Sequence, residues 1–239
     1  MGKILLMGFI AGLGTCLGAL VTLCFSRIRF WQLSLMLGFA SGAMLALTFL
    51  DLIPAALYQS ELGACLKGCI LSLIVMGLLD IFFTRTLLSG SSEHRYTILG
   101  YFIALGIAFH DLPEGLAIAA GAAEPISLGA LLTLTIGLHN IPEGMAMSAP
   151  LRVGGMDAVR IMAINFLISL ITPLGSALGM ILIKASPSFI SLLLAFAAGS
   201  MLYVVAFKLL PEAFSGRWPA SCLGIFLGII LVISFNLFF

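Results

Sequence analysis

Charged residues are scarce in this chain of 239 residues. Lys, Arg, Asp and Glu together make up 9% of it, whereas hydrophobic residues make up 62% and the mean hydropathy is +1.22. A soluble domain carries about 25% charged residues. The composition therefore excludes an ordinary soluble globule and predicts a multi-pass protein of the cell (inner) membrane, with the lipid bilayer as its surroundings.

An excess of either charge is also lacking. Eleven Lys and Arg stand against 10 Asp and Glu, which leaves a formal net charge of +1. No basic field favours nucleic acid as a partner. The apolar run after Met1-Gly2-Lys3 is too long for a signal-peptide core and has no clear cleavage site, so we expect a retained first span.

The apolar runs are long enough to cross a membrane about eight times at ~20 residues each. The charges and turn-forming residues lie in short separators between them. We therefore predict an all-α membrane protein in which residues 1–239 form one transmembrane domain. The predicted spans are residues 4–25, 33–57, 64–84, 97–121, 126–148, 156–183, 188–213 and 219–238.

Lys and Arg predict the orientation, because they are enriched in cytoplasmic loops. The connections after odd-numbered spans hold seven of them, and the opposite side holds three. The seven are Arg27, Arg29, Arg85, Arg95, Arg152, Arg160 and Arg217; the three are Lys3, Lys67 and Lys184. This asymmetry predicts that both termini lie outside.

Two segments in the middle of the chain are almost alike, His-Asp-Leu-Pro-Glu-Gly and His-Asn-Ile-Pro-Glu-Gly. Positions i and i+4 share one face of a helix. His110 therefore faces the same way as Glu114, and His139 the same way as Glu143. Two such helices side by side gather two imidazoles and two carboxylates. That donor set suits a borderline divalent metal, Zn²⁺ first.

Asp111 and Asn140 follow the two histidines, about 100° round the helix. Ionisable groups in apolar helices cost on the order of 2.5–3.5 kcal/mol each, which favours a functional interpretation. The alternative is a polar network that only clamps two helices, and the matched set of donors favours metal. Pro113 and Pro142 leave the carbonyl four residues earlier without its helical partner, as a potential further oxygen ligand.

A second repeat links the second and seventh spans. Residues 38–57 align without a gap with residues 195–214, and their prolines coincide. Both repeat pairs differ by an odd number of spans, so their members cross the membrane in opposite directions. Such an inverted repeat is typical of secondary transporters, with the site near the midplane at the repeat interface.

Asp51 and Lys208 occupy equivalent positions in this second pair, each three residues before a proline. They are either a buried pair of opposite charges, or else Asp51 belongs to a metal or proton path and Lys208 lies near the carboxylate cluster as a fixed positive charge. We interpret Asp80 and Glu212, near span ends, as hydrated interfacial carboxylates.

The paired histidine motifs resemble those of the ZIP (Zrt-/Irt-like) family of divalent-metal transporters, and its short bacterial GufA-like branch in particular. The resemblance covers nearly the whole chain. It implies a 3+2+3 helix bundle with both termini outside, no enzymatic activity and no cofactor. It also implies a substrate metal, Zn²⁺ most commonly or Fe²⁺, Mn²⁺ or Cd²⁺, that is held between the fourth and fifth spans and moves into the cytoplasm.

By position, a first metal site of the family matches four residues: His110, Glu114, His139 and Glu143. An adjacent second site matches Asp111 and Asn140 together with the two glutamates.

The chain departs from the family pattern at two positions. Thr172 and Lys208 stand where the family often has acidic residues, so negative charge is missing near the second site. Our hypothesis is a centre that holds one metal ion, with Lys208 standing in for a second cation.

Three other functions remain as alternatives. A non-transporting metal sensor agrees with the same donors. An intramembrane metalloenzyme typically needs His-Glu-x-x-His, and a di-metal redox bundle uses Glu-x-x-His pairs. The His-x-x-x-Glu order of this chain differs from both.

A homodimer is left open by Gly8-x3-Gly12, which has the spacing of a helix-pairing motif.

Overall fold

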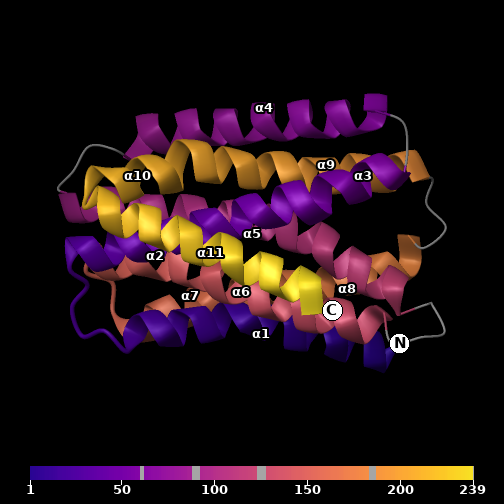
Figure 1. Ribbon diagram of the computed structural model, residues 1–239, viewed down its shortest axis with the longest axis horizontal. Helices are drawn as coiled ribbons and strands as arrows, with labels where there is room; N and C mark the ends of the chain where they lie inside the picture. Colours follow the sequence, from indigo (N-terminus) through magenta and orange to yellow (C-terminus); the bar gives the residue numbers. More distant parts are fainter. Residues whose placement is uncertain (60–61, 88–91, 123–127, 183–186, 239) are drawn as a thin grey trace.

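The computed structural model describes residues 1–59, 62–87, 92–122, 128–182 and 187–238. In these ranges the chain forms eight helical rods and no strand, and three of the rods are interrupted (Figure 1). The elements are α1 (Gly2–Leu23), α2 (Phe30–Leu47), the π-helical turn η1 (Thr48–Leu52), α3 (Ile53–Gln59), α4 (Leu62–Leu87), α5 (Ser92–Gly121), α6 (Leu128–Val153), α7 (Ala158–Ser169), α8 (Ile171–Leu182), α9 (Pro187–Val204), the π-helical turn η2 (Val205–Leu209), α10 (Leu210–Ser215) and α11 (Trp218–Phe238).

Apart from residues 126, 127 and 183, which lie outside the described residues, each predicted span coincides with one rod, which confirms the all-helical prediction. Within the described residues, seven rods are long and apolar enough to cross a membrane. The eighth, α6, is 26 residues long but is not among them. Its polar residues His139, Asn140 and Glu143 lower its hydropathy, and these are the residues that the sequence motif singles out.

Two rods contain a π-helical turn just before a proline. In η1 the N–H of Ile53 reaches back to the carbonyl of Thr48, and in η2 that of Leu210 reaches back to Val205. The following residue in each case is a proline, which removes one regular backbone bond, and the wider turn absorbs the loss. The two turns occupy equivalent positions in the predicted repeat.

A third proline divides the predicted sixth span. The helix stops at Ser169 and restarts at Ile171, so α7 and α8 replace one continuous helix. Pro173 has no N–H to donate to the carbonyl of Ser169, four residues earlier, and this accounts for the break at that point. By contrast, α5 and α6 continue through Pro113 and Pro142.

The rods run antiparallel in matched pairs. Figure 1 shows α2–η1–α3 and α9–η2–α10 crossing the bundle in opposite directions, and likewise α5 and α6. The contacts have the same symmetry: α1 packs on α6 as α8 packs on α5, and α4 packs on α9 as α11 packs on α2. The three rods before α5 and the three rods after α6 therefore contact each other as well as the α5–α6 pair.

Burial distinguishes central rods from peripheral ones. In the most apolar stretch of α2–η1–α3, 72% of residues are buried, against 22% for both α4 and α11. Large apolar side chains such as Ile70, Phe82 and Phe226 face outward. An apolar exterior is what a bilayer requires, and it leaves the interior of the bundle for the polar residues.

Glycines allow the central rods to approach one another closely at Gly115 and Gly144. A Cβ on Gly144 would collide with the backbone carbonyl of Thr15 on α1, and a Cβ on Gly115 with that of Thr172 on α8. The interval in sequence from Thr15 to Thr172 equals the interval between the two prolines that follow the π-helical turns. Thr15 and Thr172 are therefore equivalent positions of the same repeat. The repeat therefore extends to α1 and α8, beyond the segments whose sequences match visibly.

The Gly8-x3-Gly12 spacing is used within the chain. Gly8 faces Pro173 and Ser176 on α8, and Gly12 faces the carbonyl of Ser169. These glycines close an internal contact, so the motif no longer supports a homodimer.

Candidate metal centre

The two histidine motifs meet across the contact between α5 and α6. Nε2 of His110 lies 3.0 Å from Oε1 of Glu143, and Nε2 of His139 lies 3.2 Å from Oε1 of Glu114. Each histidine is thus paired with the glutamate of the other helix, although the sequence spacing emphasised the glutamate on its own helix. The four predicted donors lie together.

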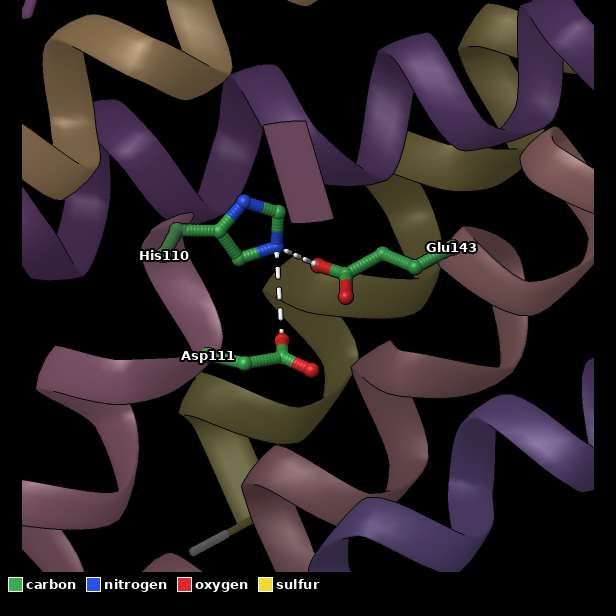
Figure 2. Close-up of side chains that lie close together, drawn as sticks. All are labelled: His110, Asp111 and Glu143. Atoms are coloured by element: carbon green, nitrogen blue, oxygen red, sulfur yellow. Dashed lines mark ion pairs between the residues drawn. The ribbon is translucent and has the colours of Figure 1, made fainter. Parts of the chain in front are cut away.

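Asp111 joins the same group. Its Oδ1 lies 3.7 Å from Nε2 of His110, and Figure 2 shows the Asp111 and Glu143 carboxylates converging on that nitrogen. The three side chains are at most 1% exposed. One imidazole nitrogen therefore faces two carboxylates in an environment without solvent.

The backbone fixes the orientation of His110. Its Nδ1 lies 3.0 Å from the carbonyl oxygen of Gly106, one turn earlier on α5. A carbonyl only accepts, so Nδ1 carries the proton and donates it to this bond. In the neutral ring, Nε2 is then a bare acceptor facing the Glu143 carboxylate, and this contact becomes favourable when a cation lies between the two. Metal-binding histidines are commonly held in this way through their second nitrogen.

Several buried oxygens lack a protein partner. Among the described residues, both carboxylate oxygens of Asp111, Oε2 of Glu114 and Oε2 of Glu143 have no hydrogen-bond donor. Buried polar groups without partners are costly, and unpaired charges more so. A network that only joined two helices would satisfy these atoms, whereas a cation site leaves them available to its ligand.

Two groups of potential metal ligands share one residue. His110, Asp111 and Glu143 form one group, and Glu114, His139 and Glu143 form the other, with ligand atoms within 4.8 Å of one another in each group. All five residues are buried. Nitrogen from imidazole and oxygen from carboxylate fit zinc and its first-row neighbours.

The remaining predicted site residue, Asn140, is tied to α1. Its Nδ2 donates to the carbonyl of Ala11 at 3.1 Å, while its Oδ1 has no partner among the described residues. Thr15 and Thr172 are also fully buried, and their hydroxyl oxygens have no hydrogen-bond partner among the described residues. Thr15 was not expected from the sequence, because a threonine in a glycine-rich apolar run is usually a packing residue.

A cavity of about 420 Å³ leads to one side of the centre. Its lining includes Glu114 and His139 of the centre, together with Asp51 of η1 and Asn236 of α11. Nδ2 of Asn236 donates to Oδ1 of Asp51 at 3.2 Å. Sequence reasoning missed Asn236, although a single amide in the apolar last span was a usable signal.

The structure corrects the prediction for Lys208. Its Nζ pairs with Oδ1 of Asp80 on α4, not with the central carboxylates, so it does not stand in for a second cation there. Asp80 and Glu212, interpreted from the sequence as hydrated carboxylates, are partly exposed, and each is paired with a cationic side chain. Glu212 is 11% exposed and pairs with Arg95 at 3.2 Å. The equivalent residues Asp51 and Lys208 do not pair with each other, because the repeat places them on separate rods with different partners.

Comparison with known proteins gives consistent matches. Residues 84–236 match the family model described as ZIP Zinc transporter. The chain is 33% identical over 231 residues, 87% of both chains, to the zinc transporter ZupT of Chlorobium luteolum. It is also 33% identical over 230 residues, 87% of this chain and 83% of the other, to the zinc transporter ZTP29 of Arabidopsis thaliana. The zinc transporter GufA of Myxococcus xanthus is 33% identical over 135 residues, 56% of this chain.

Proposed function

Because the chain belongs to the ZIP zinc transporter family, we propose that it carries a divalent metal ion across the membrane into the cytoplasm, with Zn²⁺ as the preferred substrate. Members of this family are transporters, not enzymes, which agrees with the prediction of a chain without catalytic residues. The proposed substrate ligands are His110, Glu114, His139 and Glu143. Asp111 and Asn140 complete the proposed site.

The observation that carries this proposal is the buried donor set between α5 and α6. Two histidines and three carboxylates lie together in an apolar bundle, and several of their oxygens have no partner among the described residues. Metal binding would satisfy these oxygens. The ligands come from two helices that also contact the flanking rods, so a movement of those rods can change access to the bound ion.

The proposed path begins at the cavity lined by Asp51. Two of the ligands, Glu114 and His139, line this cavity, and the carboxylate of Asp51 attracts cations to it. The carboxyl-terminal part of α11 and the turn η1 line it, on the side of the bundle where both termini lie (Figure 1). With the orientation predicted from Lys and Arg, it opens to the outside.

The proposed topology has eight crossings in a 3+2+3 inverted repeat, with α6 as the crossing that hydropathy alone does not identify. An even number of crossings keeps both termini on one side. The matched packing of α1 on α6 and α8 on α5 supports the repeat. At 26 residues α6 is long enough for a membrane of ordinary thickness.

We further propose that the centre holds one metal ion at a time. Glu143 belongs to both ligand groups, so two ions would have to share it. Thr172 provides no carboxylate beside α5. A count of two ions in the central site, by anomalous X-ray scattering from crystals grown with Cd²⁺, would contradict this proposal.

Uptake of radioactive Zn²⁺ into sealed proteoliposomes tests the proposed function. Wild-type protein should show saturable uptake, and Glu143→Ala should abolish it while the protein stays folded in the membrane. Unlabelled Cd²⁺, Mn²⁺ and Fe²⁺ added as competitors rank the metals. Asp157→Asn is a matched control, because Asp157 is a solvent-exposed N-cap of α7 and Asn caps a helix equally well.

The outcomes separate transport from the alternatives. Uptake that survives loss of both Glu114 and Glu143 would refute the site. Folded wild-type protein that binds Zn²⁺ tightly but moves none would favour a metal sensor.

A further inference from the structure

The two π-helical turns each present one polar side chain to the last rod of the other repeat. In η1, Asp51 accepts a hydrogen bond from Asn236 of α11. In η2, the equivalent residue Lys208 donates to Asp80 of α4. The repeat therefore builds two related polar contacts, one in the proposed outer cavity and one toward the opposite end of the bundle.

The contact at the second turn is a charged one. Nζ of Lys208 lies 2.5 Å from Oδ1 of Asp80, and the two side chains are 19% and 20% exposed. The hydroxyl of Tyr203 donates to the other oxygen, Oδ2, at 3.0 Å. The same ammonium lies 4.6 Å from the centre of the Phe102 ring, where the aromatic face attracts a cation. Lys208 is thus held at Asp80 by several contacts.

A second ion pair lies beside the first. Arg95 of α5 and Glu212 of α10 pair at 3.2 Å, and both pairs line a cavity of about 250 Å³. Four charged residues from four elements (α4, α5, η2 and α10) face this space. A metal ion that left the centre toward the α10 end of the bundle would pass near two carboxylates, each of which is paired with a cationic side chain.

We propose that Lys208 is a tethered cation that keeps Asp80 from binding the metal in transit. A carboxylate that is four-fifths buried beside a path for divalent ions would otherwise retain them, because a buried charge without a partner recruits one. The ammonium of Lys208 supplies that partner within the chain. It neutralises Asp80 whenever a metal ion passes, so that no stable metal site forms at this mouth, the α10 end of the bundle.

This role differs from that of Asp51 at the other mouth. There, the equivalent contact uses the neutral amide of Asn236, so the carboxylate keeps its negative charge and attracts cations. The neutral partner of Asp51 thus lets one mouth attract metal, and the cationic partner of Asp80 lets the other mouth release it. The inference rests on the proposed function for its direction, but the binding it predicts is measurable without transport.

Metal stoichiometry tests the proposal. The protein is purified in detergent, equilibrated with Cd²⁺ at rising concentration, and its bound metal counted. We expect Lys208→Met to bind one ion more than wild type, at lower affinity than the central site. Adding Asp80→Asn should remove the extra ion, and Lys208→Arg, which keeps the charge, should match wild type. Lys67→Met is the matched control, because Lys67 is an exposed lysine on α4.

Transport gives the second readout. In proteoliposomes that show Zn²⁺ uptake by wild type, Lys208→Met should lower the maximal rate several-fold, and Lys208→Met with Asp80→Asn should recover it in part. An unchanged ion count in folded Lys208→Met would overturn the proposal, as would an extra ion that persists without Asp80. Wild-type protein that binds metal but transports none would instead contradict the proposed function, and the ion count would still decide the role of Lys208.

Discussion

Nε2 of His110 on α5 lies 3.0 Å from Oε1 of Glu143 on α6. The equivalent contact in the repeat joins Nε2 of His139 to Oε1 of Glu114 at 3.2 Å. The metal ligands are therefore paired across two antiparallel helices, and any ion bound there ties the two helices together.

Glu143 should matter more than Glu114. Glu143 contributes to both ligand groups, whereas Glu114 contributes to one. We expect Glu143→Gln to weaken Cd²⁺ binding by more than the roughly 10–100-fold typical of a lost supporting contact, and Glu114→Gln to weaken it less. Isothermal titration of the purified variants measures both affinities. Equal losses in the two variants would argue against a shared carboxylate.

Metal affinity should fall as the pH falls. The histidines and carboxylates must be deprotonated to bind metal, so protons compete with it. Between pH 7.5 and 5.5 we expect the Kd for Zn²⁺ to rise by up to about tenfold per pH unit for each proton displaced. Equilibrium dialysis across this range measures the slope. A Kd independent of pH would mean that the ion is bound by backbone carbonyls in place of these side chains.

Gly144→Ala should destabilise the bundle. Its new methyl group would collide with the carbonyl of Thr15, and overpacking of this kind costs about 1–3 kcal/mol. Thermal unfolding in detergent should show a lower midpoint. Gly63→Ala on α4 is the control, because the space around its Cβ is open and alanine favours a helix. A Gly144→Ala variant as stable as wild type would show that α1 and α6 pack less tightly than the structure indicates.

Asp51→Asn should affect capture more than passage. The Asp51 carboxylate lines the outer cavity, apart from the buried ligand groups. Loss of its charge should raise the KM for Zn²⁺ on the order of a few-fold and leave the maximal rate nearly unchanged. Uptake at several Zn²⁺ concentrations separates the two parameters. A lower maximal rate with an unchanged KM would place Asp51 in the transport step itself.

Thr172→Glu should add a metal ion to the centre. Thr172 is fully buried on α8 beside α5, and its hydroxyl oxygen has no partner among the described residues. A carboxylate there gives the second metal site, which includes Asp111 and Asn140, a further oxygen ligand. Bound Cd²⁺ per chain should rise from one to two, while Thr172→Val, similar in size, should keep the wild-type count. An unchanged count in folded Thr172→Glu would indicate that missing charge at this position is not what limits the centre to one ion.

The sequence by itself determined the helical rods, their approximate bounds and the six candidate ligands. Long apolar runs can satisfy their backbone only as helices in a bilayer, and a His and a Glu four residues apart share a helix face whatever surrounds them. The gapless match between residues 38–57 and 195–214 likewise identified two equivalent segments with coincident prolines, and the structure adds a π-helical turn before each proline.

Only the tertiary structure decided which side chains meet. The sequence associated Lys208 with the central carboxylates, whereas the packing of α4 on α9 gives it Asp80. It also associated each histidine with the glutamate of its own helix, whereas the antiparallel approach of α5 and α6 exchanges the partners. Spacing along one helix fixes a face, but the relative position of two helices depends on contacts such as Gly144 against Thr15, which involve residues far apart in the sequence.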